Sequence, residues 1–220
     1  VIDAYGTAAQ RVVVVPHGIE PTLGADVRPA AELRHDYGLG DGPVIVFPAI
    51  THPHKGHRFL LELLASTWTD PDLRLVLLGG AGHADAAVDA DIERLGLARR
   101  VRRPGRVSDA DRDGLIAMAD ALVFPSQYEG FGAPVVEAMA LGTPVICSDQ
   151  PALVEVAGEA AIVRPLTAGA WADALDEAIT RRDELAVAGR QRAGAFTAAR
   201  SGAALAEAYE RTLELGDRHR

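Results

Sequence analysis

Two glutamates, Glu129 and Glu137, stand on either side of a glycine-rich turn in the most informative part of the sequence. Within the turn, Gly130 and Gly132 allow a tight bend and a close approach of the backbone to a ligand. Pro134 suits the first position of a helix, where its missing N–H would have no partner. Glu137 falls about one turn into that helix. Both carboxylates can therefore face the same ligand site, one from the turn and one from the helix.

The start of this expected helix predicts an anion site. Free amides of Gly132, Ala133 and Val135 would point out of it, and the helix dipole favours negative charge there. Carboxylates, in contrast, accept hydrogen bonds from hydroxyls. Amides between two carboxylates therefore suit a diphosphate between two polyols, as in a nucleotide sugar. These residues leave an alternative equally open, in which Glu129 is a solvated loop residue and Glu137 a first-turn acid.

The elements that must position this turn are short apolar runs that alternate with segments of helical period. This pattern is typical of βα units around a parallel sheet whose strands are buried on both faces. Strands are expected at 12–15, 44–47, 73–78, 101–103, 121–124, 145–147 and 160–163. Helical spacing is found at 59–64, 92–97, 115–118, 135–141, 171–179 and 205–213, with a short helix at 29–37. In such sheets ligands bind outside the carboxyl ends of the strands.

The composition predicts one globular domain. With 220 residues and 48% hydrophobic content, residues 1–220 should share one core, with 198–215 as a terminal helix. The net charge of −9 argues against a nucleic-acid partner, which would need a basic surface. The single Cys147 excludes an intrachain disulfide and is expected in a buried strand. The first residues, 1–5, resemble the tail of a helix, so we interpret the sequence as a fragment.

Three further signals are set aside. The acidic pairs at 89–91 and 109–111 resemble metal-binding pairs but fall where helices begin or run, so no metal site is expected. The glycines at 79–82 follow a strand but lack the spacing of a dinucleotide loop. Ser126 lacks the flanking glycines of a nucleophile elbow.

The turn and its helix resemble a known family signature. The Glu-Gly-Phe-Gly sequence, with glutamates seven residues apart and followed by Glu-Ala-Met-Ala-Leu-Gly-Thr-Pro-Val-Ile, is similar to that of the retaining, GT-B-fold glycosyltransferases of family four, group 1. Residues 14–19 resemble the family's first strand and turn, and Lys55-Gly56 its phosphate-binding lysine. The resemblance covers nearly the whole chain. It implies a doubly wound, Rossmann-like α/β domain with a six-stranded parallel sheet, the C-terminal half of a GT-B fold.

The resemblance also implies roles for individual residues. Glu137 would bind the ribose hydroxyls, and Glu129 the donor sugar near the reacting carbon. Lys55 would neutralise the departing diphosphate, where charge builds in the transition state. We therefore expect Glu129 and Lys55 to be the catalytic residues. The turn from Gly130 would place the remaining backbone contacts, in which the sugar meets the amides of Phe131 and Gly132 and the diphosphate those of Ala133 and Val135.

One departure from the family pattern concerns the leaving group. Many relatives carry an arginine five or six residues before the lysine, where this sequence has Ile50 and Ala49. Candidate substitutes are His52, His54, Arg58 and Arg106. The loop after the strand at 101–103 would, by resemblance, present Arg106 and Val107 to the nucleotide base.

The implied function is metal-independent retaining transfer of a hexosyl group from a GDP-, dTDP- or UDP-sugar, with no cofactor. The Pro-His-Lys sequence before Gly56 resembles bacterial mannosyl- and rhamnosyltransferases of cell-envelope polysaccharide synthesis. Expected partners are the donor, an N-terminal domain of the same enzyme and an acceptor sugar or lipid-linked glycan. The expected location is the cytoplasm, with peripheral attachment to the inner membrane through the missing half. A non-catalytic nucleotide-sugar binding module and a GT-B nucleotide-sugar epimerase are the alternatives.

Overall fold

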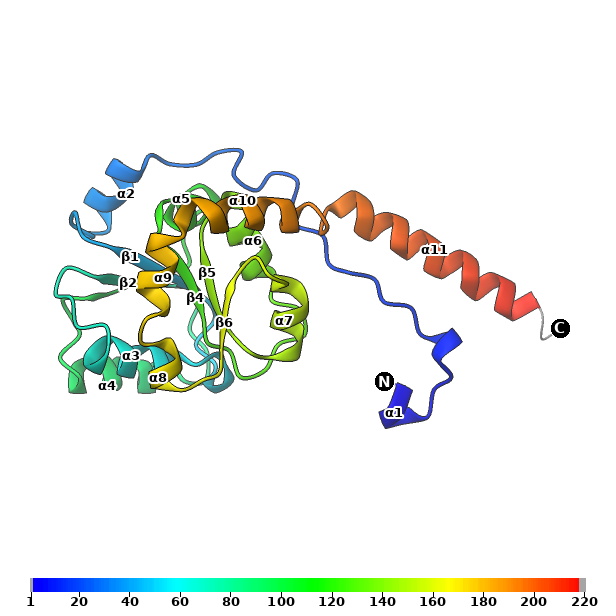
Figure 1. The fold of residues 1–220 in the computed structure, drawn as a ribbon, viewed down its shortest axis with the longest axis horizontal. Helices are drawn as coiled ribbons and strands as arrows, with labels where there is room; N and C mark the ends of the chain where they lie inside the picture. The colour runs from blue at the N-terminus through cyan, green and yellow to red at the C-terminus, as the bar shows by residue number, and fades with distance from the viewer. Residues whose placement is uncertain (1, 218–220) are drawn as a thin grey trace.

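A computed structural model describes residues 2–217 and contains one parallel six-stranded sheet (Figure 1). The strand order is β3-β2-β1-β4-β5-β6, a doubly wound arrangement in which the first three strands extend the sheet to one side of β1 and the last three to the other, so the strand order reverses between β1 and β4. The strands are β1 (Val44–Pro48), β2 (Arg74–Leu78), β3 (Val101–Gly105), β4 (Ala121–Phe124), β5 (Val145–Ser148) and β6 (Ile162–Arg164). The predicted α/β fold with six parallel strands is confirmed.

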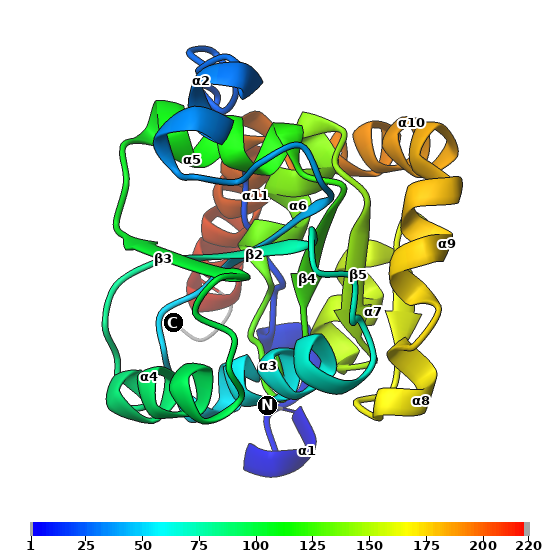
Figure 2. The same cartoon turned by 90° about the vertical axis from the view of Figure 1, so that its left-hand side faces the viewer.

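Burial on both faces explains why these strands are apolar without alternation. Val44, Ile45, Val46 and Phe47 of β1 are all fully buried, as expected for a central strand covered by helices on both sides. Figure 2 shows α5 and α6 on one side of the sheet and α3 and α4 on the other. The core therefore lies in two layers, one on each face of the sheet.

The prediction of a strand at 12–15 is wrong. That run lies outside the sheet, on the blue segment that leads from η1 to the domain (Figure 1). Val14 is 77% exposed, and no strand in the described part of the chain lies beside it to pair with. The β-branched sequence favours extended backbone, but without a neighbouring strand it does not form a ladder.

The helices agree with the predicted periods in the centre of the chain and depart from them toward its end. They are α1 (Ile2–Tyr5), α2 (Ala30–Asp36), α3 (His57–Ser66), α4 (Asp85–Arg94), α5 (Asp109–Met118), α6 (Ala133–Leu141), α7 (Pro151–Ala157), α8 (Ala168–Trp171), α9 (Ala174–Thr180), α10 (Arg182–Ala193) and α11 (Ala198–Asp217), with 3₁₀ turns η1 (Ala9–Arg11) and η2 (Pro53–Lys55). The helix expected at 92–97 begins and ends earlier, and the one at 171–179 is two helices. α7 and α10 were not predicted.

The terminal helix is confirmed as α11 and projects from the domain (Figure 1). The segment that leads into the domain and the segment that leaves it toward α11 lie side by side where α11 begins. The Ile19 amide donates a 2.8 Å hydrogen bond to the Phe196 carbonyl there. None of the described helices is both long and apolar enough to cross a bilayer.

Candidate functional site

The glycine-rich turn leads directly into α6, as the sequence predicts. Gly132 precedes the helix with a φ of +96°, a left-handed conformation that a side chain would strain. Helix α6 begins at Ala133, so Pro134 is its second residue and not its first. Gly142 ends the helix as its C-cap in the left-handed conformation, which glycine adopts without strain.

One predicted ligand donor is already occupied. The amide of Val135 donates to the Gly132 carbonyl at 3.0 Å, and its side chain is fully buried. The prediction of a free Val135 amide was therefore wrong, because the first turn of α6 closes tightly on its N-cap. The exposed Ala133, at the first helical position, remains at the helix start where an anion is favoured.

The predicted catalytic residues, Lys55 and Glu129, form an ion pair. Lys55 Nζ donates to Glu129 Oε1 at 2.7 Å, and the side chains are 20% and 10% exposed. The ammonium also lies 5.8 Å from the ring centroid of Phe124, the last residue of β4. The structure thus places both residues together at the carboxyl edge of the sheet, beyond β1 and β4.

Backbone contacts hold these two loops together. The carbonyl of His54, in η2, accepts hydrogen bonds from the Gln127 amide at 2.7 Å and from Ser126 Oγ at 3.3 Å. At Gly56, with a φ of +84°, an added Cβ would lie 2.3 Å from the Pro125 carbonyl oxygen. Only glycine allows this approach, so the position of Lys55 is fixed relative to the loop that carries Glu129.

Glu137 lies one turn into α6 and is largely buried. Burial raises the pKa of its carboxyl group, and the positive charge of Arg112 offsets part of that rise, while Asp113 adds to it. Arg112 is itself held by Asp113 at 2.8 Å and Asp109 at 3.1 Å. The charges at the start of α5 thus act on the Glu137 carboxyl group. A hydroxyl group of a ligand could donate to this carboxylate the hydrogen bond that its burial from water removes.

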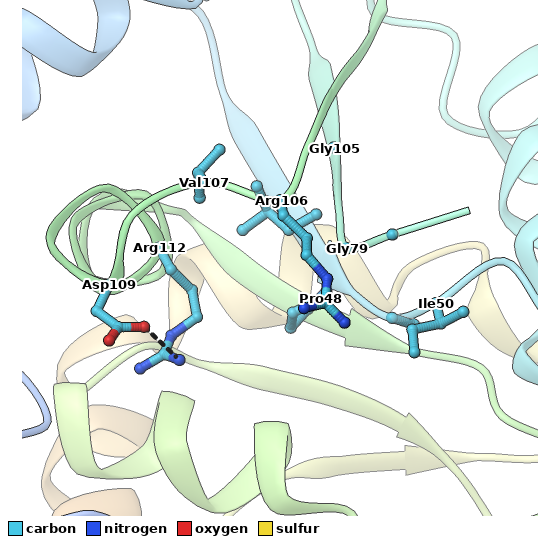
Figure 3. Close-up of a pocket in the computed structure, with 11 residues that line it drawn as sticks. Pro48, Ile50, Gly79, Gly105, Arg106, Val107, Asp109 and Arg112 are labelled. Atoms are coloured by element: carbon cyan, nitrogen blue, oxygen red, sulfur yellow. Dashed lines mark ion pairs between the residues drawn. The ribbon is translucent and has the colours of Figure 1, made fainter. Parts of the chain in front are cut away.

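A cavity of about 340 Å³ opens beside this cluster (Figure 3). It lies at the carboxyl ends of β1, β2 and β3, the expected place for a ligand in an open α/β sheet. Arg106 and Val107, both predicted, line it together with Asp109 and Arg112. The rest of the wall is largely backbone and apolar, from Pro48, Ala49, Ile50, Leu78, Gly79, Gly80 and Gly105.

Sequence reasoning missed part of this wall. Arg112 was not singled out, and Asp109 was interpreted only as a helix-start acid. Gly79 was set aside with its neighbours, yet a Cβ there would lie 2.6 Å from the Ala49 carbonyl oxygen. A glycine directly after a buried strand was the signal that the backbone must pass closely at this edge.

The remaining predicted residues lie apart from the cavity. Gly130 and Phe131 line a smaller hollow of about 180 Å³ with His17 and Phe196, and the Phe131 and His17 ring centroids are 5.3 Å apart. The ring of His54 stacks on His52 with centroids 5.8 Å apart. Arg58, a candidate substitute for the missing arginine, pairs instead with Glu62 on the surface of α3.

Comparison with known proteins identifies the family. Residues 30–196 match the family model for glycosyl transferases group 1. The chain therefore belongs to the glycosyl transferases group 1 family.

Individual relatives extend the match to nearly the whole chain. A D-inositol 3-phosphate glycosyltransferase of Nocardia farcinica is 32% identical over 96% of this chain and 50% of its own length. An O-antigen chain mannosyltransferase B of Escherichia coli is 39% identical over 50% of this chain and 30% of its own. The chain thus spans half or less of these two relatives.

The fold matches solved structures as well. HepE of Anabaena, solved in complex with UDP and glucose, superposes with a TM-score of 0.76 at 24% identity, over 88% of this chain and 55% of that one. The fold is that of the Rossmann-like half of GT-B glycosyltransferases.

Proposed function

We propose that this chain is the donor-binding domain of a retaining, metal-independent hexosyltransferase. The observation that supports this most is that the Lys55–Glu129 pair and the cavity both lie at the carboxyl ends of the strands. Arg112, which lines the cavity, also acts through its charge on the Glu137 carboxyl group. The nucleoside would occupy the cavity, against Arg106 and Val107. The rest of the donor would extend from there toward the start of α6.

Each part of the donor meets a group of matching chemistry. Ribose hydroxyls would donate to the Glu137 carboxylate. The diphosphate would lie at the start of α6, near the Ala133 amide and the Lys55 ammonium, where both the helix dipole and a cation favour negative charge. The sugar would meet the turn from Glu129 to Gly132, with backbone amides and one carboxylate for its hydroxyls.

The reaction that we propose retains the configuration of the sugar. The bond between the anomeric carbon and the phosphate oxygen breaks, and the acceptor hydroxyl oxygen bonds to the same face of the sugar. The acceptor proton passes to the departing phosphate oxygen. Lys55 stabilises the charge that builds on this leaving group, which makes a divalent cation unnecessary in our proposal.

The donor class is a nucleoside diphosphate hexose, with GDP-, dTDP- and UDP-sugars as candidates. The E. coli mannosyltransferase relative supports a mannosyl donor, and the Anabaena neighbour was solved with UDP and glucose. We propose that an N-terminal domain carries the acceptor, a sugar or lipid-linked glycan. We further propose a cytoplasmic location, with attachment to the inner membrane through that domain, in cell-envelope polysaccharide synthesis. No observation in the described residues favours the binding-module or epimerase alternatives.

Calorimetric titration of this chain with GDP, UDP and dTDP and their hexose derivatives tests the proposal. One base class should bind, with equal affinity in magnesium and in EDTA. Glu137→Ala should weaken that binding about tenfold to a hundredfold, the loss of hydrogen bonds to a charged group. Binding that needs magnesium, or that Glu137→Ala leaves unchanged, would contradict the proposed site.

A further inference from the structure

The ion pair between Lys55 and Glu129 affects how strongly the site binds the nucleotide-sugar donor relative to the nucleoside diphosphate product. Without a ligand, the 2.7 Å contact neutralises the Lys55 ammonium, and both side chains are mostly shielded from water. A pair at this depth is less screened than one on the surface. The cation proposed for the leaving group is therefore already engaged by the carboxylate proposed for the sugar.

A bound diphosphate changes this balance. It carries two or more negative charges and would be attracted to Lys55 but repelled by Glu129 beside it. The two loops are fixed by the bonds of Gln127 and Ser126 to the His54 carbonyl. Any rearrangement is therefore confined to the two side chains, and the lysine stem is long and flexible enough to turn between two partners.

Resting on the proposed function, we infer that Lys55 exchanges partners during the reaction cycle. The diphosphate of the donor takes the ammonium, and the released Glu129 carboxylate accepts a hydrogen bond from a hydroxyl of the donor sugar. After transfer, the nucleoside diphosphate has no such hydroxyl. Glu129 then lies unpaired beside the phosphate and recovers Lys55, which weakens the hold on the product. Glu129 thus makes the site prefer the donor over the spent nucleotide.

The test is a double-mutant cycle of binding. The wild-type chain, Glu129→Gln, Lys55→Gln and the double variant are titrated with UDP, GDP and dTDP and with UDP-glucose, GDP-mannose and dTDP-rhamnose. The matched control is Glu184→Gln, which breaks a second 2.7 Å pair, between Glu184 of α10 and Arg181, the residue before that helix. The neighbouring Arg182 bonds to the Ala119 carbonyl before β4, so this control lies at the opposite edge of the sheet.

The inference predicts opposite effects on the two ligand classes. Glu129→Gln should bind the nucleoside diphosphate about threefold to tenfold more tightly than wild type, because no carboxylate competes for Lys55. Its preference for the nucleotide sugar over the diphosphate should fall by a similar factor. In the Lys55→Gln background the same change should have a smaller effect, and Glu184→Gln should have none.

The contrary outcomes are separable. If Glu129→Gln leaves diphosphate affinity unchanged or lowers it, the exchange is wrong, although the donor site stands. An equal gain with and without Lys55 would also overturn the exchange, since simple repulsion would then explain it. If the wild-type chain binds none of the six ligands, the proposed function fails, and the inference with it.

Discussion

The ring of His57, the first residue of α3, packs against the ring of Phe47 in β1, with centroids 4.6 Å apart. His57 is only 3% exposed, and neither ring nitrogen makes a hydrogen bond with the described residues. Burial, assisted by the positive charge of Arg103, lowers the pKa of this imidazole to about 4. His57 thus lies buried and neutral two residues after Lys55.

His57 should make the domain sensitive to acid. Because the pKa is lower in the folded chain than the ordinary value near 6.5, the folded state resists protonation. Its contribution to stability is complete above about pH 6.5 and is lost as the pH falls toward 4. The free energy of unfolding should fall by about 3 kcal/mol over this range through His57.

Urea denaturation at pH 7, 5.5 and 4.5 measures this effect. His57→Leu should lose markedly less stability than wild type on acidification. The control His35→Gln, on the exposed surface of α2, should follow wild type. Parallel pH profiles for wild type and His57→Leu would show that His57 does not carry the sensitivity.

Glu137 should lower the stability of the domain as the pH rises, whereas His57 lowers it as the pH falls. Its carboxyl pKa is raised, chiefly by burial, so the folded state is most favoured while the group is protonated, and this contribution is lost as pH rises through the folded pKa. Glu137→Gln should therefore raise the midpoint of thermal unfolding at pH 7 but not at pH 4, while weakening donor binding about tenfold or more. Glu93→Gln, an exposed change on α4, should do neither. A lower midpoint at pH 7 would mean that the carboxylate is better paired than its burial implies.

Gly56 should tolerate no side chain. Gly56→Ala adds left-handed strain and a contact with the Pro125 carbonyl, and should cost about 3 kcal/mol. Gly96→Ala is the matched control, because Gly96 has a φ of +69° but open space where a Cβ would be, and should cost only about 1 kcal/mol. Chemical denaturation compares them. Equal losses would show that the two loops are not in close contact.

Ser108 should stabilise the start of α5 and with it the charged wall of the cavity. Its Oγ accepts a 3.1 Å hydrogen bond from the Asp111 amide, which makes Ser108 the N-cap of this helix. Ser108→Ala should lower the free energy of unfolding by about 1 kcal/mol. Ser201→Ala, inside α11, removes a hydroxyl without a cap and should be neutral or slightly stabilising. If both variants match wild type, the cap contributes nothing.

The sheet was predictable because parallel strands that are buried on both faces consist of continuous apolar residues. Six of the seven expected runs became strands, and the failure at 12–15 arose because extended backbone needs a partner that local sequence does not reveal. Helix α10 escaped prediction for a related reason. Its Gly189 lies against Met139 of α6, so it packs through small residues and lacks the apolar stripe from which helices are recognised.

The site was predictable in its parts but not in its pairings. Glycine and glutamate spacing located the turn before α6. The bond between Lys55 and Glu129, and the effect of the Arg112 charge on Glu137, depend on how separate elements pack against one another. The Val135 amide is occupied because the first turn of α6 closes tightly enough for it to reach the Gly132 carbonyl. The residue types in the turn do not determine how tightly it closes.

The most direct test of the donor site is to map nucleotide binding on the ¹⁵N-labelled chain by NMR, with GDP, UDP and dTDP added in turn. The account predicts that one of them shifts the backbone amides of Arg106, Val107 and Ala133. Trp68 lines a separate hollow together with Pro43, the residue before β1, at the opposite edge of the sheet. The amides around this Trp68 hollow should not move. Shifts confined to the Trp68 hollow, or none with any of the three nucleotides, would contradict a donor site at the carboxyl edge.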